Sequence, residues 1–240
     1  MLQGPDPSPL PHRQELLARL KQAPIFARCT DRQLQALAQR SRLVRLDAGE
    51  ILFRHGDKAK ALYLLGHGQL KLYRTSADGD ELIIDLVDAG MTFGETRAFR
   101  DDPHYHFSCA ALRDAELVAV DFPAFVAVLH DSAETCLLLL QRNAERAEHQ
   151  VDDIDRLALQ GGACRVASYL LGQLRPGRSE FVLTVPKGVL ATRLGLRAET
   201  LSRALRKLWA AGIVAAGRGN IVRVLSREKL QRFIEDGGKP

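Results

Sequence analysis

The sequence has few cysteines, and none has the spacing of a metal site. The four thiols lie far apart in the chain, so the CxxC spacing of zinc and redox centres is absent; they are Cys29, Cys109, Cys136 and Cys164. Isolated thiols of this kind are typically small, buried apolar residues. The sequence therefore predicts no metal centre.

Long apolar runs and a leader pattern are also missing. No apolar segment reaches the roughly 18 residues of a membrane-spanning helix. The first residues, MLQGPDPSPLPHRQ, contain four prolines and no apolar core, unlike a signal peptide. A basic amphipathic helix with aromatic anchors is absent as well. We expect a cytoplasmic protein without a membrane partner.

Motifs of the common enzyme classes are lacking too. The chain has no glycine-rich phosphate loop, no metal-ligand spacing and no G-x-S-x-G nucleophile motif. Two glycine-rich turns in the β-rich region are typical of hairpins. We therefore expect a protein that is not an enzyme.

Charge, in contrast, is present and unevenly distributed. Residues 161–240 contain 15 Lys and Arg against 5 Asp and Glu, whereas residues 1–160 contain 19 against 24. A basic C-terminal third beside a mildly acidic remainder indicates a polyanionic partner for one domain only. The length of 240 residues and a hydrophobic content of 46% are enough for two domains with real cores.

The stretch from Lys187 to Trp209 is typical of a helix-turn-helix. Two helical patterns meet near Gly195, where the chain can adopt a positive φ without steric cost. In the second pattern three leucines recur at spacings of four and three, which puts them on one face. The alternative is a solvated helix held in a core by these leucines. The opposite face carries side chains that can pair with base edges in a major groove: Arg197, Glu199, Thr200, Ser202, Arg203, Arg206 and Lys207.

A hairpin follows the predicted recognition helix. Short β-rich runs flank AAGRGN, with Gly217 and Gly219 at the turn. A hairpin directly after a recognition helix is typical of the winged variant of this motif. Arg218 then occupies the position of a phosphate contact.

From Leu43 to about Phe122 the hydrophobic period changes from helical to alternating. Short β-rich runs are separated by glycine turns, as at Gly49, Gly68 and Gly79. Many short strands at regular spacing favour an antiparallel jelly-roll sandwich or barrel. Together with the helical segments, this pattern predicts an α+β fold.

The segment 133–159 reads as one long helix with a heptad seam. A narrow seam favours two parallel helices in a dimer over a helix packed on its own barrel. A dimer would present two recognition helices to two half-sites one helical turn apart. The seam runs over nearly four repeats through Ala133, Leu137, Leu140, Ala144, Ala147, Val151, Ile154 and Ala158.

These patterns divide the chain into four parts. We expect a disordered lead over residues 1–20, with helical patterning from near Arg13, and a β-roll domain over 21–130. A dimerisation helix over 131–160 and a winged helix-turn-helix domain over 161–240 follow. Two glycines ending a long helix favour an articulation, so Gln160-Gly161-Gly162 is predicted to be the hinge.

This order of elements resembles the CRP/FNR superfamily of bacterial transcription regulators, over about residues 20–235. Its carriers are Gly68 in LLGHGQLKLY, the element Phe93-Gly94-Glu95, and AETLSRALRKL in the recognition helix. The resemblance implies a cyclic-nucleotide-binding-like roll that senses a small effector and shifts the long helices, and with them the recognition helices. It also implies a homodimer that binds double-stranded DNA, with RNA polymerase as a partner.

The recognition helix resembles the FNR branch more than the cAMP-receptor branch. The E-x-x-S-R pattern of that branch stands here as Glu199, Ser202 and Arg203. The resemblance implies a palindrome with half-sites of the TTGAT type. The chemistry agrees, because Arg203 can pair with guanine, Glu199 can accept from cytosine or adenine amino groups, and Ser202 can lie near thymine.

The expected effector pocket contains Glu95, Tyr105 and His106. Cyclic-nucleotide-binding members of the family keep a Gly-Glu pair and, further along, an Arg-Ser pair whose arginine binds the cyclic phosphate. Gly94-Glu95 is kept here, but Tyr105-His106 stands at the Arg-Ser positions and provides no permanently charged fork. We therefore expect no cAMP binding and a structural role for Glu95; a cAMP-responsive regulator is the alternative.

Other effectors follow from further comparison with the family. Iron–sulfur members have an N-terminal cysteine cluster, whereas this chain has only Cys29 there, so we expect no cluster. The Asp-Pro-x-Tyr turn that ends at Tyr105 resembles the DNR-like branch, which regulates denitrification and senses nitric oxide through haem. A haem needs an axial ligand and an apolar pocket. His106 and His149 are the leading candidates, ahead of His55, His67, His104 and His130, with Cys109 and Met91 behind them.

A second class of function is a ligand-binding module that regulates a partner protein, as similar β-rolls do in kinases and channels. Such modules have no basic winged helix-turn-helix. The second domain therefore favours DNA binding.

Overall fold

The computed structural model describes residues 10–217 and 220–238. The chain forms two compact units that divide between Arg146 and Ala147. This division falls inside the expected dimerisation helix, not at either of its ends. Arg218, the expected phosphate contact of the wing, lies outside the described residues.

The first unit begins with a helix, α1 (Leu10–Gln22). The expectation of a disordered lead through residue 20 is therefore wrong from Leu10 onward. Leu16 and Leu20, four residues apart, are fully buried, so α1 has a packed apolar face. Arg19 also binds Glu15 within the helix and Glu116 on β6, which holds α1 against the roll.

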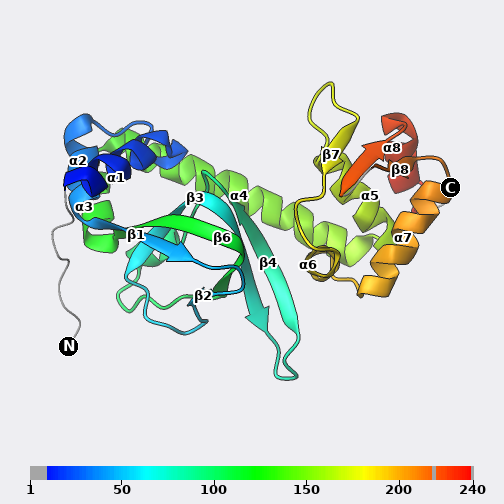
Figure 1. Ribbon diagram of the computed structural model, residues 1–240, viewed down its shortest axis with the longest axis horizontal. Coiled ribbons are helices and arrows are strands. Elements are labelled where there is room, and N and C mark those ends of the chain that lie inside the picture. Colours follow the sequence, from blue (N-terminus) through cyan, green and yellow to red (C-terminus); the bar gives the residue numbers. More distant parts are fainter. Residues whose placement is uncertain (1–9, 218–219, 239–240) are drawn as a thin grey trace. The chain divides into compact units, whose positions relative to one another are not determined.

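Two further helices complete this end of the unit. After the short 3-10 turn η1 (Pro24–Phe26), α2 (Asp31–Gln39) begins at a capping box of Thr30 and Gln33. α3 (Phe122–Asp131) follows the last strand of the roll. Figure 1 shows α1, α2 and α3 grouped at one end of the roll.

The roll is an antiparallel sheet, as predicted. Its main strands are hydrogen-bonded in the order β1-β6-β3-β4, while β2 pairs with β6 and β5 with β3. The strands are β1 (Ser41–Leu46), β2 (Ile51–Phe53), β3 (Ala61–Thr75), β4 (Glu81–Asp88), β5 (Thr92–Phe93) and β6 (Ser108–Asp121).

Gly68 marks a register shift between the two longest strands, β3 and β6. Its φ is +95°, and a Cβ at this position would lie 2.4 Å from the carbonyl oxygen of Asp114. Only glycine fits such a close backbone approach. This explains why the LLGHGQLKLY segment needs glycine at that point.

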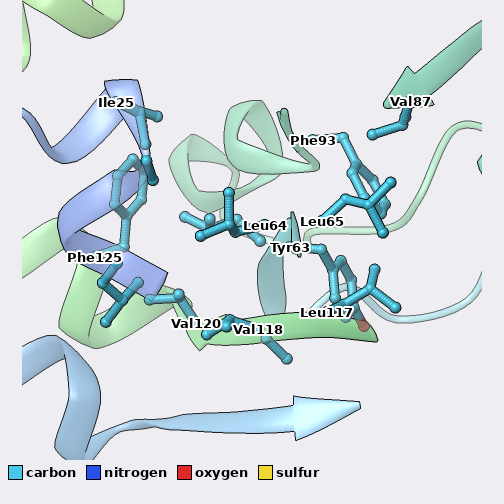
Figure 2. Packing of buried hydrophobic residues seen from close by; sticks show 14 of the residues in the cluster. Ile25, Tyr63, Leu64, Leu65, Val87, Phe93, Leu117, Val118, Val120 and Phe125 are labelled. Atoms are coloured by element: carbon cyan, nitrogen blue, oxygen red, sulfur yellow. The ribbon is translucent and has the colours of Figure 1, made fainter. Parts of the chain in front are cut away.

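The core of the first unit joins the helices to the roll. Figure 2 shows Ile25 and Phe125, from the helical segments, in one cluster with Leu64, Val118 and Val120 from β3 and β6. Phe125 is fully buried and meets Phe26 edge to face, with ring centroids 6.3 Å apart. The helices at this end are therefore part of the roll's hydrophobic core.

The long helix α4 spans Ala133–Leu159, the range predicted from its heptads. Among the described helices, none alone is long and apolar enough to cross a membrane. Only α3 and α4 taken together have the required length and apolar composition, and they are bent by 114° where they join. Four residues of α3, Phe122 and Phe125 among them, are buried in the core of the first unit.

The second unit contains the remaining elements. Its sheet has the order β7-β9-β8, with β8 and β9 forming the predicted hairpin. Its elements are α5 (Gly162–Gly172), β7 (Glu180–Val182), α6 (Lys187–Arg193), α7 (Ala198–Ala210), β8 (Val214–Ala216), β9 (Ile221–Val224) and α8 (Arg227–Glu235).

Candidate nucleic-acid interface and sensor site

The turn between α6 and α7 has the geometry of a helix-turn-helix. Gly195 adopts φ +61° and its amide donates to the carbonyl of Thr192 at 3.0 Å. The amide of Leu196 donates to the carbonyl of Ala191 at 2.8 Å. These bonds satisfy the free carbonyls at the end of α6 and set the direction in which α7 begins.

The helix α7 has one buried face and one exposed face, as its sequence predicted. Leu201, Ala204, Leu205 and Leu208 are buried in the second unit. On the other face the side chains of Glu199 and Arg203 are 85% and 71% exposed and form an i,i+4 pair at 3.4 Å. Exposed donors and acceptors on a helix held by its leucines are what base recognition in a major groove requires.

The other predicted contacts on this face are all exposed, but they differ in whether they have a partner within the protein. Arg197, Thr200, Ser202 and Arg206 are exposed. Lys207 is not free, because its Nζ donates to the carbonyl of Gly238 at 2.6 Å and lies 5.7 Å from the centre of the Phe233 ring. Sequence spacing placed Lys207 with the base-facing residues, whereas packing turns it towards the C-terminal segment.

The first unit contains a buried carboxylate, Glu95. It begins the 3-10 turn η2 (Glu95–Phe99), directly after Gly94 at φ +85°, and is 6% exposed. Its Oε1 lies 3.7 Å from a guanidinium nitrogen of Arg146 on α4, and a second nitrogen of Arg146 binds Asp85 of β4 at 3.0 Å. Glu95 therefore lies where α4 meets the roll.

Two polar atoms at this junction have no hydrogen-bond partner among the described residues. They are Oε2 of Glu95 and Nη1 of Arg142, both buried. Burial raises the pKa of Glu95, while a backbone hydrogen bond and the charges of Arg146 and Arg142 oppose the shift. Neither arginine was among the expected site residues, because the i,i+4 spacing on α4 does not reveal what packs against it.

Tyr105 and His106 lie in different environments, although they are neighbours in the sequence. Tyr105 is 3% exposed, stacks on Phe53 with centroids 3.7 Å apart, and donates its hydroxyl to the carbonyl of Ala61 at 2.8 Å. It is therefore a core residue of the roll and not an open pocket wall. His106 is exposed, and the nearby Arg97 guanidinium lowers its pKa.

The two leading haem-ligand candidates do not fit a haem as they lie here. An axial ligand needs an apolar pocket around it. The side chains of His106 and His149 are both exposed. A groove of about 680 Å³ in the first unit lies between α2 and α3 and is lined by neither histidine.

The expected dimer seam on α4 is mostly exposed in the single chain. Leu140, in the first unit, is 64% exposed, and Val151 and Ile154, in the second, are 58% and 63% exposed. Ala144 and Ala147 are exposed too. Apolar side chains of this size on a regular helical spacing favour burial against another helix.

Replacing Glu95 by Gln is expected to stabilise the protein at pH 8 and to change little near pH 5. The raised pKa means that the folded state favours the protonated acid. Stability is therefore lost as the pH rises from 4.5, the ordinary pKa of the carboxyl in the unfolded chain, through its higher pKa in the folded protein. Glutamine removes this loss because it cannot ionise.

Chemical unfolding at the two pH values measures the effect, with the exposed Glu148→Gln on α4 as the matched control. A Glu95→Gln protein less stable than wild type at pH 8 would show that the attraction to Arg146 outweighs desolvation.

Comparison with known proteins agrees with this geometry. The family model for the cyclic nucleotide-binding domain matches residues 43–132, and that for the Crp-like helix-turn-helix domain matches residues 164–233. A cyclic-nucleotide-binding-type domain followed by a Crp-like helix-turn-helix domain defines a DNA-binding transcription regulator.

Relatives along most of the chain give the family. The cyclic AMP receptor protein of Thermus thermophilus is 32% identical over 176 residues, which are 72% of this chain and 79% of that protein. The chain belongs to the CRP/FNR superfamily of transcription regulators.

Solved structures show the same fold. FixK2 from Bradyrhizobium japonicum has a TM-score of 0.71 at 21% identity, covering 80% of this chain and 96% of that chain. The sensor domain of the transcriptional regulator DNR from Pseudomonas aeruginosa has a TM-score of 0.53 at 31% identity, covering 61% of this chain and 98% of that domain.

Proposed function

We propose that this protein is a cytoplasmic homodimer that reads a palindrome of TTGAT-type half-sites under control of an effector sensed by its roll. The observation that carries the proposal is the exposed face of α7, where Glu199, Ser202 and Arg203 stand on a helix anchored by buried leucines. Arg203 pairs with guanine, Glu199 accepts from a base amino group, and Ser202 lies near thymine.

The dimer follows from α4 and completes the site. Leu140, Val151 and Ile154 are exposed in the single chain and share one face of the helix. Two such helices paired in parallel relate two copies of α7 by a two-fold axis, which matches the symmetry of a palindrome. RNA polymerase is the partner that the family implies for a regulator bound at a promoter.

Binding to defined duplexes tests the reading of DNA. We expect the full-length protein to bind a duplex with two inverted TTGAT half-sites at least about a thousandfold more tightly than a scrambled duplex of the same composition at physiological salt. Fluorescence anisotropy at two salt concentrations measures both affinities. Equal affinity for the two duplexes would contradict sequence-specific reading of this half-site.

Nitric oxide is the effector that the DNR-like resemblance implies, with denitrification genes as targets. The 31% identity to the DNR sensor domain supports the comparison. The exposed histidines argue against a preformed haem site. The absorption spectrum after haem reconstitution tests this effector, and a Soret band that nitric oxide shifts supports it. If the protein takes up no haem, nitric oxide sensing through haem is excluded.

A cyclic nucleotide is the second candidate effector, favoured by the family model of the roll and by the relative that is named a cyclic AMP receptor protein. The resemblance to the cyclic-nucleotide-binding members implies that Glu95 would hold the ribose of such a ligand. However, Tyr105 is packed in the core and His106 is exposed, and neither provides a phosphate fork. Calorimetric titration with cAMP distinguishes the candidates, and we expect no binding heat.

A further inference from the structure

The connection between α4 and α5 is packed against the helix-turn-helix. A Cβ added to Gly162 would lie 2.9 Å from a methyl group of Leu196 and 3.5 Å from the methyl group of Thr200. On the other side of the connection, Gln160 accepts a hydrogen bond from Ser168 of α5 at 3.0 Å. Gly162 therefore permits close packing against the helix-turn-helix, whereas Gly161 is exposed and a Cβ there would meet nothing within 4 Å.

Arg165, in the first turn of α5, joins the end of α4 to the turn before the recognition helix. Its Nη1 donates to the carbonyl of Leu157 at 3.4 Å. A Cβ added to Gly195 would lie 3.2 Å from this Nη1 and 3.2 Å from Cδ2 of Leu157. Arg165 and Leu157 therefore meet at the glycine that separates α6 from α7.

The chemistry of this contact suits an arginine. The last carbonyls of a helix have no partner within the helix and carry partial negative charge, so a cation there is favourable. The Nε of Arg165 is buried without a hydrogen-bond partner among the described residues. Such burial is unfavourable for a donor, and a side chain serving only solubility would turn into solvent.

We propose that Arg165 is a positioning residue that fixes the last turn of α4 to the turn of the helix-turn-helix. Gly161-Gly162 is then not a free hinge, and the direction of α7 follows the C-terminal end of α4. The consequence for DNA rests on the proposed function: a dimer with this clamp accepts one spacing between half-sites. The clamp itself can be tested without DNA.

Hydrogen exchange of the full-length protein tests the clamp directly. Arg165→Met keeps the length of the side chain and removes its donors, so we expect the hydrogen-bonded amides of Gly195 and Leu196 to exchange roughly tenfold faster. Arg165→Lys retains a donor for the carbonyl of Leu157 and should exchange as wild type does. The control Arg232→Met changes an exposed arginine of α8 and should leave these amides unaffected.

Half-site spacing supplies a readout that a general loss of stability would not change. One inserted base pair rotates the second half-site by roughly 35°, so we expect wild type to prefer the original spacing by at least about tenfold. In Arg165→Met this preference should fall to about threefold or less, whereas weakened folding would lower both affinities by the same factor.

The two experiments separate the two proposals. Unchanged exchange in Arg165→Met overturns the role of Arg165, whatever the protein does on DNA. Faster exchange in Arg165→Met than in wild type supports the clamp. If the wild-type protein then binds neither duplex, the proposed half-site is rejected while the clamp stands. Faster exchange with an unaltered spacing preference overturns the inference that Arg165 sets the direction of α7.

Discussion

Arg203→Ala is expected to lower affinity for the specific duplex by about 5- to 150-fold, which corresponds to about 1–3 kcal/mol, and to relax base preference at one position of each half-site. The guanidinium of Arg203 is 71% exposed, and its contact within the protein is a surface pair with Glu199. The substitution therefore removes a base contact with little effect on the fold, because α7 is held by buried leucines on its other face.

Anisotropy titrations against duplexes mutated at each half-site position measure both effects. Arg28→Ala is the control, since it removes the same charge from an exposed position in the first unit. Arg218→Ala should instead weaken all sequences alike and flatten the salt dependence, as expected for a phosphate contact in the wing. If Arg203→Ala kept wild-type affinity and preference, α7 would not be the recognition helix.

Val151→Asp is expected to convert the dimer into monomers. Val151 is 58% exposed in the single chain and lies in the middle of the heptad seam. A dimer would bury it against its own copy, so aspartate there would place two unpaired carboxylates in an apolar contact. Loss of the second half-site should also lower affinity for the palindrome by about a hundredfold, because two linked contacts become one.

Size-exclusion chromatography with light scattering measures the mass. His149→Asp is the matched control, because it adds a charge two residues away on the opposite face of α4, where the side chain is exposed. We expect the control to remain dimeric. If the protein remained dimeric with Val151→Asp and with substitutions at the other seam residues, the dimer contact would lie elsewhere.

The fold was predictable where local pattern decides it. The bounds of α4, the break at Gly195, the leucine face of α7 and the hairpin β8–β9 all agree with the sequence. In each case the period of apolar residues, or a glycine needed for a positive φ, is sufficient to define the element. Helical patterning from near Arg13 was predicted, but the start of α1 at Leu10 and its packing on the roll were not, because the prolines near its start are typical of an irregular segment.

The site was predictable only in part. Residues that face solvent from a regular helix, such as Glu199 and Arg203, follow from spacing. Lys207 has the same spacing but binds the C-terminal segment, which no local pattern indicates. Tyr105 and His106 are neighbours in sequence, yet one lies in the core and the other in solvent.

By itself the sequence determined the order of elements, the family and the side chains offered to DNA, because periodicity, turn glycines and a helix motif are local properties. Only the tertiary structure decided which charges meet. It placed Arg146 beside Glu95 and Asp85, and Arg165 beside Leu157 and Gly195. Such contacts join segments distant in the chain, so they depend on how whole elements pack and are not encoded in the spacing of any one of them.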